Sequence, residues 1–144
     1  MGLLANSKKN AEEFLDSVGD LLARDYGASG LVRRKKRDIT NPVPTEILAD
    51  LVRQCDVVVV GVGDCGSCSA SAIADGLLLE AEGIPAVVVC TEAFRTTADA
   101  MAALRGSPGY QYVTTAHPVA VLDGDGVRER AEQAITEIVG TVAR

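Results

Sequence analysis

The segment Asp56-Val57-Val58-Val59-Val60-Gly61-Val62-Gly63-Asp64-Cys65-Gly66-Ser67-Cys68-Ser69 decides the expected fold of this chain. Its four consecutive valines are typical of a strand that is buried on both faces. Two glycines then end the strand, and small and polar residues lead into a helix expected over residues 69–82. A strand, a tight turn and a helix in this order indicate an α/β protein with a parallel sheet.

The same alternation recurs on both sides of this segment. Upstream, we expect strands at residues 2–5 and from Leu31, with helices over 8–24 and 46–54. Downstream, we expect strands over 86–90 and 110–115, with helices over 97–104 and 127–142. The pattern predicts a single α/β domain over residues 1–144, a three-layer α/β/α sandwich with a five-stranded parallel sheet, flavodoxin-like or Rossmann-like. The preferred strand order, 2-1-3-4-5, puts a ligand crevice between strands one and three.

Composition narrows the class of partner. Apolar residues make up 47% of the 144 residues but aromatic residues only 3%, so the core must be mainly aliphatic. The net charge of −6 argues against a nucleic-acid partner. No apolar stretch approaches the roughly 20 residues of a membrane span, and the apolar N-terminus is too short for a signal peptide. These features predict a cytoplasmic protein with no membrane partner, in which the four cysteines are thiols.

One basic run, Arg33-Arg34-Lys35-Lys36-Arg37, departs from the acidic average. It indicates either a solvated strand end and loop or a site for an anionic ligand or partner.

The strongest chemical signal is the pair Cys65 and Cys68 at the entrance to a helix. Unpaired backbone N–H groups and the positive end of the helix dipole stabilise a thiolate at such a place. The spacing lets Cys68 attack a disulfide or sulfenate formed on Cys65. The hydroxyls of Ser67 and Ser69 can donate to a developing oxyanion, or one of them can cap the helix.

Three other interpretations of this turn remain open. A zinc site needs a second pair of ligands, and Cys55, Cys90 and His117 lack the paired spacing. The order Gly61-x-Gly63-x-x-Gly66 matches a nucleotide-binding turn, but that motif is weak by itself. The two cysteines can also be purely structural. We predict no metal and no cofactor.

Further polar residues are expected at the same edge of the sheet, because they follow other predicted strands. Glu92 and His117 are candidates for moving protons, and Asp64 is a candidate acid or a group that orients an N–H or hydroxyl. Cys55 and Cys90 are expected to be small buried hydrophobic residues. The predicted catalytic residues are Cys65, Cys68, Glu92, His117 and Asp64, and the predicted substrate-binding residues are Gly63, Gly66, Ser67, Ser69, Thr91, Asn6, Lys9 and Asn10.

Four blocks of the chain resemble the UGSC family, which is named for a selenocysteine-Gly-Ser-Cys motif. The run 56–69 carries the motif, with Cys65 at the position that selenocysteine occupies in some members. Gly83-Ile84-Pro85-Ala86-Val87-Val88-Val89-Cys90-Thr91-Glu92-Ala93-Phe94, Asn6-Ser7-Lys8-Lys9-Asn10-Ala11 and His117-Pro118 are similar to its other blocks.

The motif is distantly similar to that of selenoprotein B of glycine reductase, in which selenium attacks a substrate carbon during reductive C–N cleavage. The resemblance implies a nucleophilic or redox role for Cys65. It does not imply C–N cleavage, because a thiol is less acidic than a selenol and a poorer leaving group.

The sequence is consistent with three functions. The first is an enzyme of reductase or lyase type, in which Cys65 attacks a small anionic substrate and Cys68 is the second thiol. The second is a thiol-disulfide or peroxide oxidoreductase that uses the same pair. The third is a non-catalytic partner subunit. A homodimer or a larger partner subunit is expected in addition to the small-molecule substrate, and the apolar segments 1–5 and 119–122 are candidate contact surfaces.

Overall fold

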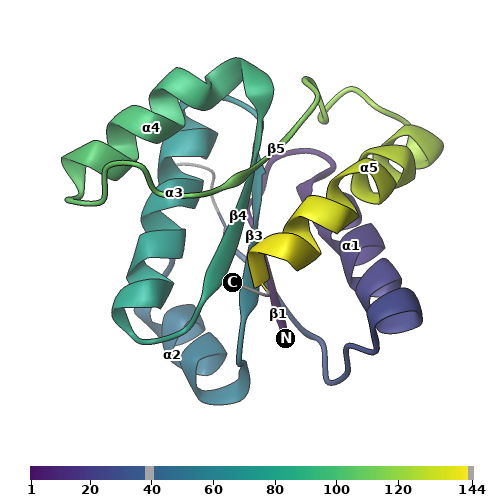
Figure 1. Cartoon of the computed structure of the whole chain (residues 1–144), viewed down its shortest axis with the longest axis horizontal. Coiled ribbons are helices and arrows are strands. Elements are labelled where there is room, and N and C mark those ends of the chain that lie inside the picture. Colours follow the sequence, from purple (N-terminus) through teal and green to yellow (C-terminus); the bar gives the residue numbers. More distant parts are fainter. Residues whose placement is uncertain (38–40, 143–144) are drawn as a thin grey trace.

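Five parallel strands form one sheet in the order β2-β1-β3-β4-β5, as the sequence predicted (Figure 1). The computed structural model describes residues 1–37 and 41–142. The strands are β1 (Gly2–Ala5), β2 (Val32–Lys35), β3 (Val58–Gly63), β4 (Ala86–Thr91) and β5 (Val113–Thr115). The helices are α1 (Ala11–Tyr26), α2 (Thr45–Gln54), α3 (Gly66–Ala81), α4 (Arg95–Leu104) and α5 (Gly124–Val142), and a short 3-10 helix, η1 (Glu92–Phe94), precedes α4.

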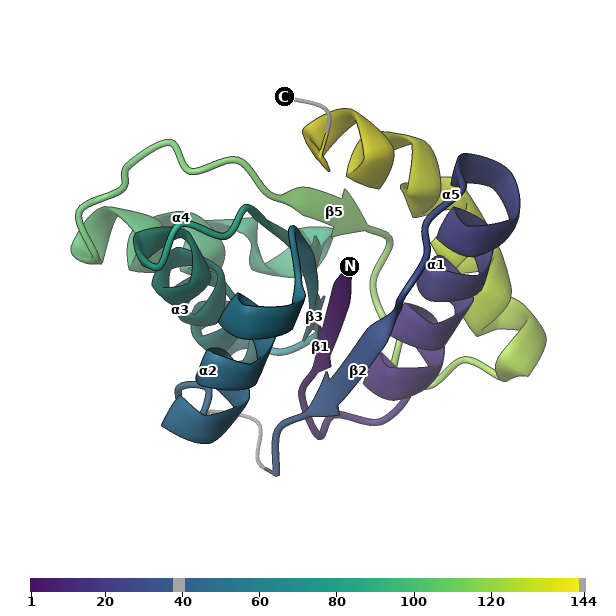
Figure 2. The same cartoon turned by 90° about the horizontal axis from the view of Figure 1, so that it is seen from below.

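Helices cover both faces of the sheet, which gives the predicted three layers. Helices α1 and α5 lie on one face, and α2, α3 and α4 lie on the other (Figures 1 and 2). Each face has its own aliphatic core. The core under α1 and α5 includes Phe14, Leu15 and Ile138, and the core under the other helices includes Leu51, Ile73 and Leu79.

The central strands are the valine-rich segments that predicted the fold. Every residue of β3 and β4 is buried, whereas β2, at the sheet edge, alternates between half-buried and exposed residues. Strand β1 pairs with both β2 and β3 and is fully buried. The prediction that residues 1–5 form a contact surface is therefore wrong for residues 2–5, which lie inside the sheet.

Several element boundaries differ from prediction, and the starts of α1 and β5 do so for identifiable reasons. Helix α1 begins at Ala11 rather than at Lys8, because Asn10 adopts a left-handed backbone conformation with φ of 70°. Strand β5 begins at Val113 rather than at Tyr110. The Tyr110 side chain instead packs close to Gly76 of α3, where an added Cβ would lie 2.9 Å from the phenol oxygen.

The basic run is largely paired within the protein. The ammonium group of Lys36 is buried, with Nζ 2.6 Å from Oδ2 of Asp75 and 2.8 Å from the Ser71 hydroxyl. Burial raises the pKa of Asp75, although Lys36 and the Val43 N–H both favour its charged form. Burial therefore disfavours the charged form of Asp75, and the ion pair with Lys36 offsets part of this cost. Removing Lys36 alone would leave the cost without its offset.

Replacing Lys36 by methionine is expected to lower the free energy of unfolding by about 3–5 kcal/mol, because Asp75 would be left as a buried charge without its cation. Urea denaturation measures the effect. The double variant Lys36→Met/Asp75→Leu should recover most of the loss, because no charge stays buried. Arg33→Met is the matched control. Its ion pair with Asp16 is exposed and is expected to contribute less than about 1 kcal/mol. A Lys36→Met protein as stable as this control would contradict the prediction.

Candidate functional site

The turn between β3 and α3 places the two motif cysteines at the carboxyl edge of the sheet. Strand β3 ends at Gly63, and only Asp64 and Cys65 separate it from the first residue of α3. The close approach needs glycine, because a Cβ on Gly63 would lie 2.7 Å from Sγ of Cys90 and 2.8 Å from Cα of Ser69. The first turns of α3 therefore pack in close contact with the end of β3.

Cys65 and Cys68 are joined by a disulfide, whereas Cys55 and Cys90 are buried free thiols. The prediction of four thiols is therefore wrong for the motif pair, and the prediction of small buried residues is confirmed for the other two. The physical reason lies in the helix start. Residues three apart lie one turn apart there, and the two Cα atoms are 5.0 Å apart, within the range that a disulfide spans.

The two sulfur atoms of the motif differ in exposure. Cys68 is fully buried, and Cys65 is partly exposed. The backbone N–H of Cys68 donates to Sγ of Cys65 over 3.1 Å, and the Ser67 hydroxyl oxygen lies 3.5 Å from the same sulfur. Cys65 is thus the N-cap of α3, and the helix begins three residues before the predicted Ser69. Neither Ser67 nor Ser69 caps it.

Asp64 joins this turn to the segment that follows β5. Its carboxylate is buried and accepts hydrogen bonds from the N–H groups of Val119 (3.1 Å) and Ala120 (2.7 Å). One of its oxygens also lies 3.2 Å from Nδ1 of His117. Asp64 therefore orients N–H groups, one of the roles that the sequence allowed for it.

Thr91, at the end of β4, also contacts His117. Its hydroxyl donates to the Gly63 carbonyl over 3.3 Å, and the same oxygen lies 3.0 Å from Nδ1 of His117. The Asp64 carboxylate oxygen accepts hydrogen bonds, and the Thr91 oxygen can accept from Nδ1 while its hydroxyl donates to the carbonyl, so both contacts favour the proton on Nδ1. The neutral imidazole then has its lone pair on Nε2, the atom that can accept a proton. The ring of Phe94 packs edge-on against this imidazole, with centroids 5.3 Å apart.

The other predicted site residues fall into three groups. Three have side chains committed to the backbone: Ser69 donates to the Gly63 carbonyl, Asn6 to the Val62 carbonyl, and Asn10 to the carbonyls of Val119 and Leu122. Glu92 and Lys9 are exposed, and each belongs to a segment that begins where a strand ends. Gly66 and Ser67 form the first turn of α3.

One residue of this region was missed by sequence reasoning. Arg130 of α5 donates to the carbonyls of Ala116 and Pro118 over 3.2 and 3.1 Å, on either side of His117. It lies in the middle of an amphipathic helix with other charged residues, so no pattern in the sequence distinguishes it. Only the packing of α5 beside the segment after β5 shows its role.

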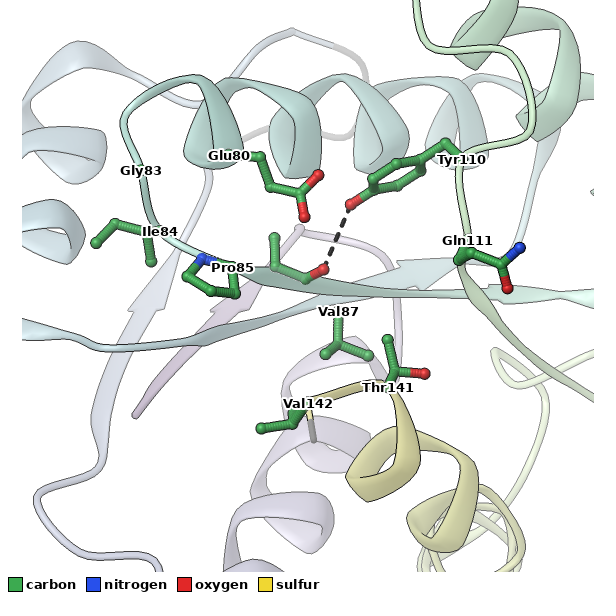
Figure 3. A pocket seen from close by; sticks show the side chains of 10 residues that line it. Glu80, Gly83, Ile84, Pro85, Val87, Tyr110, Gln111, Thr141 and Val142 are labelled. Carbon is green, nitrogen blue, oxygen red and sulfur yellow. Dashed lines mark hydrogen bonds between the residues drawn. The ribbon is translucent and has the colours of Figure 1, made fainter. Parts of the chain in front are cut away.

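A hollow of about 520 Å³ lies at the opposite edge of the sheet (Figure 3). Glu80, the turn before β4, Tyr110 and the last turn of α5 line it, and the Tyr110 hydroxyl donates to the Ala86 carbonyl over 3.4 Å. Because β4 begins here and ends beside Cys65 and His117, the hollow is separate from the predicted site and contains none of its residues.

The described part of the chain contains no group of three His, Cys, Asp or Glu side chains placed to hold a metal ion. Within the same residues, every helix is too short or too polar to cross a membrane.

Comparison with known proteins agrees with the motif. No curated protein matches the chain. A family model described as the UGSC family matches residues 1–144. The comparison does not confirm the more distant likeness to selenoprotein B of glycine reductase. The match extends from the four similar blocks to the whole sequence, and the chain therefore belongs to the UGSC family.

Proposed function

We propose that the protein is a thiol-dependent reductase in which Cys65 is the nucleophile and Cys68 is the resolving thiol. The disulfide between a partly exposed Cys65 and a buried Cys68 carries this proposal. An external electrophile can reach only the exposed sulfur, and the buried sulfur is already placed to attack it. Membership of the UGSC family is compatible with such cysteine chemistry.

The proposed reaction has two steps that balance in atoms and electrons. The Cys65 thiolate attacks a sulfur or oxygen atom X of a substrate X–Y, such as a disulfide or a peroxide, so that a sulfur–X bond forms and Y leaves with the bonding electrons and takes up a proton. Cys68 then attacks the Cys65 sulfur, which forms the disulfide and releases X with a proton. The substrate gains two electrons and the dithiol loses two. A separate dithiol compound reduces the disulfide and closes the cycle.

His117 is proposed to exchange protons with the leaving group through Nε2. Asp64 and Thr91 support this role, because both hold the opposite ring nitrogen. Lys9, Gly66 and Ser67 are proposed to bind a small anionic substrate, since they belong to segments at the carboxyl edge of the sheet. Glu92 is a second proposed proton donor at this edge.

The four cysteines of the reduced protein are expected to differ widely in their reaction with iodoacetamide. Cys65 should be alkylated first and at the lowest pH, because it is exposed and its sulfur accepts a backbone hydrogen bond at a helix start. Burial raises the pKa of Cys90 to about 12 and also raises that of Cys55, so both should stay unlabelled below pH 9 unless the protein unfolds. Peptide mass mapping after timed labelling measures the order. Faster labelling of Cys68 than of Cys65 would contradict the assignment.

Three small probes test the reaction itself: hydrogen peroxide, the cationic disulfide cystamine and the anionic disulfide dithiodiglycolate, each with dithiothreitol as the reductant. The wild-type protein should consume at least one of them catalytically. Cys65→Ser should be inactive. Cys68→Ser, reduced and then freed of dithiothreitol, should stop after the first step and accumulate a Cys65 adduct, visible by intact mass, because no other thiol is present to resolve it. Cys55→Ser is the matched control and should behave as wild type. If no probe reacts faster than with free N-acetylcysteine, the proposal is wrong.

His117→Gln is expected to lower turnover of the reactive probe by about 10²–10⁴-fold, the usual contribution of a positioned acid or base. Glutamine keeps a polar side chain of similar length but cannot exchange the proton. Steady-state rates across pH measure the effect, and the pH profile of the variant should differ from that of the wild type. Circular dichroism checks that the variant is folded. A folded variant with an unchanged rate and pH profile would exclude this role.

A further inference from the structure

The segment 116–122, which carries His117, has few backbone partners of its own. It connects β5 to α5 without regular secondary structure, and much of its backbone is hydrogen-bonded by side chains from other elements. Asp64 holds two of its N–H groups, as described above. Its carbonyls are held by two residues from opposite ends of the chain, Asn10 and Arg130.

Asn10 precedes α1, and both hydrogens of its side-chain amide are donated to this segment. Its side-chain nitrogen donates to the carbonyls of Val119 and Leu122, each over 2.9 Å, and an amide has only two such hydrogens. Among the described residues, Asn10 is the one non-glycine residue with a positive φ. Asparagine tolerates this conformation better than most residues, so backbone and side chain both favour it here.

Arg130 holds the carbonyl groups of the two residues that flank His117. A single guanidinium nitrogen donates to the Ala116 carbonyl and to the Pro118 carbonyl. The carbonyl of the residue before the histidine and that of the residue after it are therefore fixed to the same atom. This contact restrains the backbone segment 116–118 that carries His117, whereas Asp64 and Thr91 contact its ring.

We propose that Asn10 and Arg130 are positioning residues that hold His117 with Nδ1 facing Asp64 and Thr91, and so keep Nε2 as the proton acceptor. The inference deepens the proposed function and rests on it for its catalytic meaning. Neither residue touches the substrate. Asn10, which the sequence predicted as a substrate ligand, is assigned a different role because both of its donors are used within the protein.

The test uses the fact that His117 is the only histidine in the chain. A nitrogen-15 correlation spectrum of the imidazole in the full-length protein therefore reports this ring alone. The wild type should show the tautomer with the proton on Nδ1. Asn10→Gly removes the amide but keeps the positive φ, and Arg130→Met keeps an apolar stem without donors. Each should lower the ratio of Nδ1-protonated to Nε2-protonated ring by about fivefold, the order expected when one or two hydrogen bonds are lost.

Arg128→Met is the matched control, because Arg128 is an exposed arginine of the same helix. It should leave the spectrum unchanged, and Arg130→Lys should restore part of the wild-type ratio. A purely structural role would lower the urea midpoint of the variants without changing the tautomer ratio of the folded protein, and that result would overturn the inference. If Arg130→Met does not fold, Asn10→Gly decides the test by the same ratio.

The two proposals fail in different ways. If His117→Gln turns over the probe as fast as wild type, the catalytic role of His117 is lost while the tautomer measurement stands. If the tautomer ratio is unchanged in folded Asn10→Gly and Arg130→Met proteins, the positioning role is lost while the reductase proposal stands.

Discussion

The buried carboxylate of Asp64 is the contact on which the geometry of this site depends. It belongs to the turn that delivers Cys65 to the start of α3, and it accepts hydrogen bonds from the segment that carries His117. These two segments are more than fifty residues apart in the chain. A buried carboxylate is stable only when it accepts hydrogen bonds. The hydrogen bonds from the Val119 and Ala120 N–H groups therefore hold the segment 116–122 against the turn.

The parallel sheet makes this meeting possible. Because β3, β4 and β5 run side by side in the same direction, the turn after β3, Thr91 at the end of β4 and the segment after β5 all emerge at one edge. Thr91 then bridges the first and the third of these through the Gly63 carbonyl and His117. The site is thus a consequence of strand direction, supplemented by a few polar side chains at the strand ends.

The fold could be predicted because its signals are local. The valine runs of β3 and β4 indicate buried parallel strands, and the alternation with helices leads to the observed strand order. The details of the site could not be predicted from the sequence, because they depend on tertiary contacts. Gly66, Ser67 and Cys68 are poor helix formers, yet α3 extends over them because the Cys65 sulfur caps the helix by accepting from the Cys68 N–H. Arg130 resembles any exposed arginine until α5 is placed beside the segment after β5.

The position of the motif at the first turn of α3 bears on how the protein can change redox state. Cys68 is already helical, and its N–H donates to the sulfur of Cys65, which also caps the helix. Reduction leaves this donor in place, so a Cys65 thiolate would inherit the same hydrogen bond that the disulfide sulfur accepts. The helix start need not rearrange between the two states. A cap that serves both states keeps the Cys65 sulfur oriented in both of them, and the burial of Cys68 leaves Cys65 as the more accessible cysteine of the pair.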